Sequence, residues 1–185
     1  MIEGDALVLP PAALAEAKGL LRAGDAGEDE AIAAMLQSAA ELCERFTGQV
    51  LIVRGFRQTL RGAADWRRRH GWQRLARTPV RAIGTVETLA PDGTAETPAP
   101  GHYAVDIDAN GDGWIRSADA AGPQLRVAFE AGMAADWEAV PAPLRQGILR
   151  LAAHLYTFRT DAGAQAEPPA AVTALWRPWR RPHLG

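Results

Sequence analysis

The chain has 185 residues, of which 48% are hydrophobic, and its formal net charge at pH 7 is −2. This length and apolar content suffice for a substantial core and favour one domain with an appendage over two domains. The charge argues against a general nucleic-acid binder, which would carry a basic excess. A single cysteine, Cys43, excludes an intramolecular disulfide framework and indicates synthesis in a reducing compartment.

Targeting and membrane signals are not visible in the sequence. The opening residues MIEGDALVLPP contain neither a basic segment nor an apolar core of the kind that export signals carry. No stretch approaches about 18 consecutive apolar residues, the length of a membrane-spanning helix. We therefore expect a soluble protein without an export signal of its own and without a membrane partner.

The segment 26–47 carries the longest unbroken helical period in the chain. Its apolar residues recur three or four positions apart from Ile32 to Phe46, which predicts one buried stripe. Asp25 and Glu28 have the spacing of a capping box at the start of a helix. Gly48 is the residue type that commonly ends one.

Two further helices are predicted. A short one is expected over 11–23, and a second amphipathic helix is expected over 141–159, where apolar residues recur at helical spacing. We predict that 141–159 packs against 26–47, because each apolar stripe needs a partner. Residues 160–169 are typical of a linker, and 170–185 form an expected C-terminal docking tail.

A β insertion is predicted between these helices, over 50–131. Alternating segments are separated by tight turns such as Ala90–Gly93, so the sheet should be antiparallel. Gly55 interrupts the alternation of the first strand in the way a β-bulge would. The predicted fold class is therefore α+β, a small helical bundle with an inserted small antiparallel sheet, and residues 1–159 form its single domain.

Two segments combine tryptophan with clustered arginine, the residue types favoured in protein interfaces. The first lies in a long loop over 61–77, and the second lies near the C terminus, where prolines interrupt it. Either segment is a candidate partner-binding site; the alternative is a solvated loop with its indoles folded onto the domain. The candidate residues are Trp66, Arg67, Arg68 and Arg69 in the loop, and Trp176, Arg177, Trp179, Arg180 and Arg181 in the tail.

Catalytic and cofactor motifs do not occur in the sequence. The four histidines are scattered, none of them in HExxH or near a cysteine pair, and no glycine-rich phosphate loop or GxSxG is present. Cys43 lies on an apolar stripe with no base placed beside it, which favours an inert core thiol. We predict no enzyme activity, no catalytic residue and no cofactor or metal.

One segment has the spacing of a calcium loop. Asp108, Asn110 and Asp112 precede Gly113, and Asp119 occupies the position of the final acidic ligand of an EF-hand. The flanking segments are predicted strands rather than helices, and Asn, Asp and Gly are also what a tight hairpin turn requires. A polar turn is the favoured interpretation, and a small Ca²⁺-binding domain built on Asp108–Asp119 is retained as an alternative.

The order of segments resembles the head-tail connector, or adaptor, proteins of long-tailed bacteriophages and of the related gene transfer agents. The resemblance covers nearly the whole chain, and the arginine-rich loop over 61–77 departs from it. The segments that carry it are LAEAKGLLR at 14–22, EDEAIAAMLQSAAELCERFTGQVL at 28–51, TPVRAIGTVETLAPDGT at 78–94, HYAVDIDANGDG at 102–113, LRVAFEAG at 125–132 and VPAPLRQGILRLAAHLYTFR at 140–159.

This resemblance implies a structural part of a phage-like particle. Members of the family form a ring, commonly of twelve subunits, under the portal protein at the exit of the head, and they seat the stopper protein on the tail side. Double-stranded DNA passes through the ring without sequence-specific binding. The location implied is the head-tail junction of a particle made in the bacterial cytoplasm, with phage and gene transfer agent both open. A nucleic-acid-binding protein that uses its clustered arginines is the remaining alternative, and it would bind duplex DNA with steep salt dependence.

Overall fold

The structure is a computed structural model, and it describes residues 1–22, 26–60, 71–99, 101–117, 124–159 and 168–181. Its contacts divide the chain into two compact units. The sheet unit comprises Met1–Ala6 and Val53–Met133, and the helical unit comprises Leu7–Ile52 and Ala134–Gly185. Each unit is described by itself below. That residues 1–159 act as a single domain stays a prediction.

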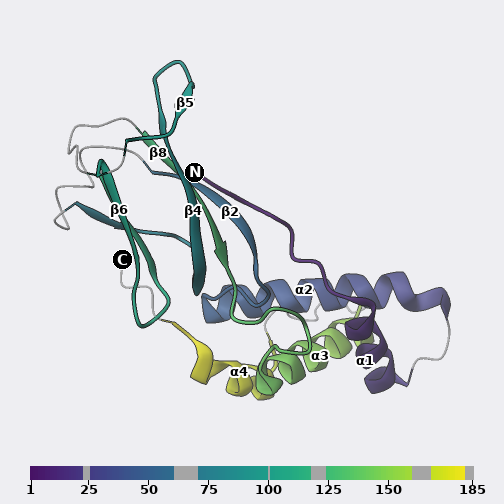
Figure 1. Ribbon diagram of the computed structural model, residues 1–185. Helices are drawn as coiled ribbons and strands as arrows, with labels where there is room; N and C mark the ends of the chain where they lie inside the picture. The colour runs from purple at the N-terminus through teal and green to yellow at the C-terminus, as the bar shows by residue number, and fades with distance from the viewer. Residues whose placement is uncertain (23–25, 61–70, 100, 118–123, 160–167, 182–185) are drawn as a thin grey trace. The chain divides into compact units, whose positions relative to one another are not determined.

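The sheet unit contains two antiparallel sheets (Figure 1). The larger has five strands in the order β1-β2-β8-β4-β5, with β8 paired to β2 and β4. The smaller has the order β3-β7-β6. The antiparallel pairing predicted from the tight turns is confirmed. The strands are β1 (Ile2–Gly4), β2 (Arg54–Leu60), β3 (Trp72–Arg74), β4 (Val80–Leu89), β5 (Ala95–Glu96), β6 (Tyr103–Ile107), β7 (Gly113–Ser117) and β8 (Gln124–Ala131).

Strands β2 and β8 form a core face because their apolar residues alternate in register. Phe56 lies opposite Phe129, and the two rings stack with centroids 5.6 Å apart. The next inward positions on the two strands are also buried. The bulge expected at Gly55 is wrong, since the β2–β8 register continues without a shift from Arg54 to Leu60.

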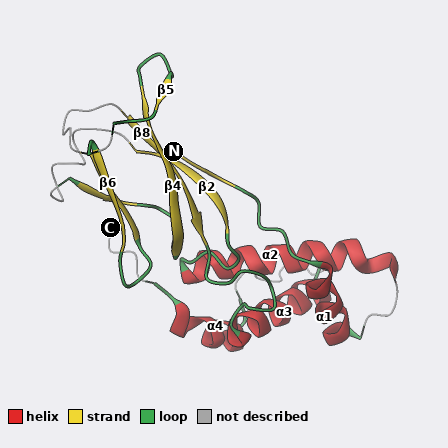
Figure 2. Cartoon of the chain, in the orientation of Figure 1, coloured by secondary structure: helices red, strands yellow, loops and turns green. Residues whose placement is uncertain are grey.

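The helical unit contains α1 (Pro11–Leu21), η1 (Ala26–Glu28), α2 (Asp29–Thr47), α3 (Ala142–Thr157), α4 (Ala170–Trp176) and η3 (Arg177–Trp179). Helix α2 packs against α3, α1 contacts both, and α4 packs against α3 (Figure 2, red). The predicted pairing of the two amphipathic helices is confirmed. Their buried positions are Ile32, Leu36, Ala39, Ala40, Cys43 and Thr47 on α2, and Leu144, Gly147, Ile148, Leu151 and Ala152 on α3.

The two ends of α2 differ in how well the sequence predicts them. Gly48 ends the helix in the left-handed conformation, with φ of 70°, and its N–H donates to the carbonyl of Glu44 at 2.8 Å. At the other end, α2 begins at Asp29 and the Glu28 carboxylate accepts a hydrogen bond from Arg159 at 3.2 Å; the predicted capping box stays a prediction, because it also needs Asp25. Asp25 lies outside the described residues.

The predicted architecture, a helical bundle with a small inserted sheet, is wrong. In the described part of the chain, four α-helices accompany two antiparallel sheets, the larger with five strands, so the β structure forms a unit of its own. The sequence pattern missed β1 and β5 because strands of three and two residues are too short to show alternation. The mixed α+β composition remains correct.

Candidate interaction surfaces

Trp176, predicted to contact a partner, lies in the core of the helical unit. Its side chain is 0% exposed, its indole N–H donates to the carbonyl of Leu144 at 3.3 Å, and its ring centroid lies 5.8 Å from that of Phe46. Gly147 provides the space, since a Cβ at that position would lie 2.2 Å from the indole nitrogen. The expectation that residues 170–185 lack a core of their own is therefore wrong for Trp176, which a partner cannot reach in this conformation.

Short helix η3 is attached to the C-terminal end of α2. The side-chain amide of Gln49 donates to the carbonyl of Trp179, and the N–H of Arg181 donates to the carbonyl of Thr47 at 2.8 Å. The guanidinium of Arg180 lies 5.8 Å from the ring centroid of Phe46. The sequence of 170–185 predicts one or two helical turns before Pro178 and an extended chain beyond; α4 confirms the turns, and the extended chain is wrong for residues 177–181, because η3 and these hydrogen bonds hold the segment on its own unit.

A basic surface remains at this end of the helical unit. We call Arg177, Arg180 and Arg181 the arginine cluster; the side chains of Arg177 and Arg180 are exposed, and Trp179 beside them is half-buried. One role is local, because cations near the C-terminal end of α2 complement the negative end of its dipole. Arginine also forms bidentate hydrogen bonds with carboxylates, so the same surface can bind an acidic partner.

The other candidate partner site from the sequence is the loop segment with Trp66, Arg67, Arg68 and Arg69. It lies outside the described residues. Its role stays a prediction.

The calcium-like segment is a hairpin turn between β6 and β7. The Asp108 carboxylate accepts hydrogen bonds from the N–H groups of Asn110 and Asp112, at 2.8 and 3.0 Å. Its second oxygen accepts the indole N–H of Trp114 at 3.0 Å. Asp119, the remaining expected ligand, lies outside the described residues. Asp108 therefore has the hydrogen bonds of a residue that closes a turn.

The second acid of this turn also points into the fold. Asp112 forms an ion pair with Arg74 at 2.9 Å and accepts a hydrogen bond from the Thr78 hydroxyl at 2.8 Å. Among the described residues, no three potential ligands gather as a metal site would require. The turn interpretation therefore accounts for both carboxylates, and no observation favours the Ca²⁺ alternative.

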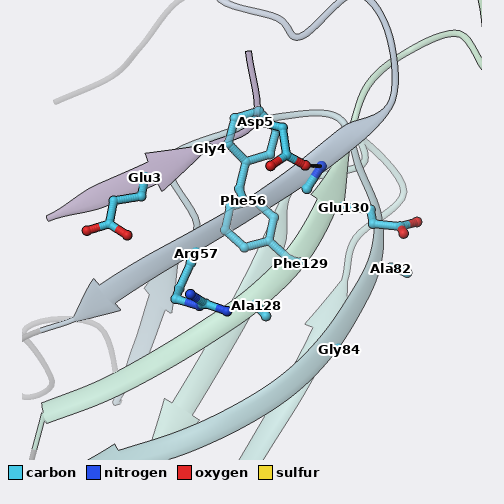
Figure 3. Close-up of a pocket in the computed structure, with 11 residues that line it drawn as sticks. Glu3, Gly4, Asp5, Phe56, Arg57, Ala82, Gly84, Ala128, Phe129 and Glu130 are labelled. Carbon is cyan, nitrogen blue, oxygen red and sulfur yellow. Dashed lines mark hydrogen bonds between the residues drawn. The ribbon is translucent and has the colours of Figure 1, made fainter. Parts of the chain in front are cut away.

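A hollow of about 660 Å³ lies in the sheet unit beside β1, β2, β4 and β8 (Figure 3). Its charged lining consists of the exposed side chains of Glu3, Asp5, Glu130 and Arg57. We call it the acidic hollow, since its lining carries three carboxylates and one guanidinium. The rest of the lining consists of Phe56, Phe129 and five small residues, namely Gly4, Gly55, Ala82, Gly84 and Ala128.

Comparisons with known proteins identify the class. No protein-family model and no curated protein sequence matches the chain. Among solved structures, it matches over its whole length a chain of the neck of an empty gene transfer agent (GTA) particle computed with C6 symmetry, with 30% identity, a TM-score of 0.77 and 98% of that chain covered. A chain in the neck of a native GTA particle with C12 symmetry matches with 30% identity and a TM-score of 0.73, and one in a native GTA virion with 29% and 0.74; both matches cover this whole chain and 98% of the other.

These full-length matches define a class of structural particle component with no enzymatic counterpart among them. The chain belongs to the family of proteins that build the neck of gene transfer agent particles. The gene transfer agent side of the resemblance stated from the sequence is thereby confirmed. Within the residues that the structure describes, no helix is both long and apolar enough to cross a membrane.

Proposed function

We propose that the chain is the head-tail connector, or adaptor, subunit of a gene-transfer-agent-like particle. It forms a ring under the portal protein, joins the portal to the stopper and tail, and lets double-stranded DNA pass. The observation that carries the proposal is the full-length match, with a TM-score of 0.77, to a chain of a GTA neck. This match extends through both units, so the likeness includes the sheet unit as well as the helices.

The symmetry of the related necks supports a ring of twelve copies. One neck was computed with C6 symmetry and another with C12 symmetry. Twelve equal copies satisfy both, because a sixfold rotation is contained in a twelvefold one, whereas six copies do not satisfy C12. A closed ring also requires two different surfaces on each copy, since every contact between neighbours is heterologous.

The partner contacts of the proposed ring are the portal on one side and the stopper on the other. The loop residues Trp66 to Arg69 are the proposed contact residues for these rings, and the arginine cluster with Trp179 is proposed to contact the portal or an adjacent copy. A net charge of −2 is compatible with a channel in which DNA slides, since a strongly basic lining would retain phosphates.

The test is deletion of the gene in its producing strain, followed by complementation. We expect heads that package DNA but carry no tails, and normal particles when the gene is restored. Tailed particles from the deletion strain would contradict the proposal. Heads without DNA would point to a role in packaging instead.

A further inference from the structure

We propose that the acidic hollow receives the arginine cluster of a neighbouring copy, and that this contact joins adjacent subunits in the ring. The inference rests on the proposed function, because it presupposes a ring, and it names the two surfaces that meet. The acidic hollow belongs to the sheet unit and the arginine cluster to the helical unit. Each copy thus carries both halves of a heterologous contact.

The first observation is the uncompensated charge of Glu130. On the five-stranded sheet its direct neighbours are Gly55 on β2 and Ala82 on β4, and neither carries a charge. Within the described ranges, no ion pair or hydrogen bond joins the Glu130 carboxylate to another residue. Directly opposed residues on adjacent strands normally compensate each other's charge. The exposed carboxylate of Glu130 is therefore available to an external cation.

The second observation is the charge balance around Glu130. Glu3 lies opposite Arg57 in the β1–β2 register, which gives that carboxylate a cation across the strands. Asp5 accepts the N–H of Gly55 at 3.1 Å, and Arg54 Nε donates to the Asp5 carbonyl at 3.1 Å, so a guanidinium lies beside this acid too. Arg57 and Arg54 thus lie near Glu3 and Asp5, and the excess negative charge of the hollow rests on Glu130. A cationic partner compensates this charge.

The third observation is the size of the acidic hollow. Glycine and alanine line the hollow next to the acids, and its volume of about 660 Å³ lies within the range of ligand pockets, roughly 300–1,000 Å³. Phe56 and Phe129 also line it, and the open volume beside the small residues is large enough for a long side chain to enter. At Gly84 an added Cβ would lie 3.3 Å from the carbonyl oxygen of Ala128, so this part of the wall is close-packed backbone.

The arginine cluster has the complementary properties. Arg177 and Arg180 are exposed, and the hydrogen bonds from Gln49 and Arg181 hold their short helix in place. A cation on a fixed backbone loses less conformational freedom on binding than one on a free tail. Arginine suits this role because its planar fork pairs with carboxylates in a bidentate manner.

A second copy is the occupant that these observations favour. The related necks have C6 and C12 symmetry, so copies of one chain meet in them. Exposed ion pairs are individually weak, which suits subunits that stay apart until a portal aligns them. Around a ring the same contact is repeated, and its effect is multiplied.

The experiment is a charge swap, read out by electron microscopy as the fraction of portals that carry a ring. One variant combines Glu3→Arg with Glu130→Arg, and the other combines Arg177→Glu with Arg180→Glu. We expect each variant to raise the concentration needed for ring formation at least about tenfold, and a 1:1 mixture to restore assembly, since a ring in which the two variants alternate pairs every hollow with a cluster of opposite charge. The chain that carries all four substitutions should recover most of the wild-type assembly.

Matched controls reverse exposed charges outside both surfaces, Glu96→Arg on β5 and Arg150→Glu on α3. Thermal unfolding of each variant verifies that it folds. Normal rings from either charge-reversed variant would overturn the inference, as would a quadruple variant that folds but does not recover. A defect confined to Arg177→Glu with Arg180→Glu would assign the cluster to the portal instead. If the wild-type chain forms no ring, the proposed function fails first.

Discussion

Gly147 shows how one residue without a side chain decides the position of another element. The indole of Trp176 occupies the place of its missing Cβ, and the space is too small for any other residue type. Periodicity counts Gly147 as an ordinary buried position of α3, so the sequence alone predicted Trp176 to be free for a partner. The burial of Trp137, also 0% exposed with its indole N–H donating to Glu16, was likewise not predicted.

The substitution Gly147→Ala tests this packing. Its methyl group must displace a fully buried indole, so we expect the free energy of unfolding to fall by about 1–3 kcal/mol in denaturant melts. Gly19→Ala is the matched control, because Gly19 lies within α1 and nothing is within 4 Å of its Cβ position. There we expect a gain of roughly 0.5–1 kcal/mol from helix propensity. Equal effects of the two substitutions would contradict the packing of the Trp176 indole against Gly147.

Cys43 is expected to be unreactive in the folded chain. Burial, and secondarily the nearby charge of Glu44, raises the pKa of its thiol far above the ordinary value, so the reactive thiolate is scarce at neutral and mildly alkaline pH. A thiol-specific chromogenic reagent at pH 8 should react only as fast as the protein unfolds, and at once in denaturant. Rapid labelling of the native chain would show that α2 does not bury this face.

At the scale of elements, long periodic segments were predictable and short or distant ones were not. The stripe on α2 and the alternation on β4, β6 and β8 produced correct elements, because each is long enough to show its period. The attachment of η3 to α2 depends on contacts 130 or more residues apart in sequence, such as Gln49 with Trp179. Periodicity cannot predict such contacts, and for the same reason it did not predict the acidic hollow, which residues from four separate strands, β1, β2, β4 and β8, assemble.

Helix pairing in the helical unit predicts a large effect for Leu151→Ala. Leu151 is 0% exposed on α3, on the face that packs against α2. Truncation removes apolar burial and leaves a cavity, so we expect a loss of about 2–5 kcal/mol in denaturant unfolding. The same change at Leu20, which is 53% exposed, should cost much less. A loss below about 1 kcal/mol at Leu151 would contradict the helix pairing.

Removal of residues 170–185 should destabilise the helical unit. A docking tail as expected from the sequence could be removed from residue 175 onward without a change in thermal unfolding, whereas the structure predicts a lower midpoint, because the deletion exposes the surface that Trp176 covers. Truncation of a buried tryptophan alone typically costs about 3–5 kcal/mol. The shorter deletion 182–185 is the control and should unfold as the full chain does. An unchanged midpoint after deletion of 170–185 would show that α4 is not held on α3 in solution.

At the scale of the whole molecule, both units of the chain are included in the full-length match to a neck protein. Most apolar surface on the amphipathic helices is used within the helical unit, which leaves charged and mixed surfaces for neighbours. Such surfaces favour a chain that stays monomeric or loosely associated until a portal aligns the copies. In the proposed ring, this would prevent closure before packaging.

The central claim is tested most directly by electron microscopy of the purified chain, alone and mixed with the portal protein encoded beside it. Light scattering of the chain alone at micromolar concentration should give the mass of a monomer. With the portal present, images should show an added ring of twelve copies on one face of the portal, with an open channel. A stable ring formed without the portal would contradict the proposed mode of assembly, and portals that remain bare would contradict the identification of the chain as the adaptor.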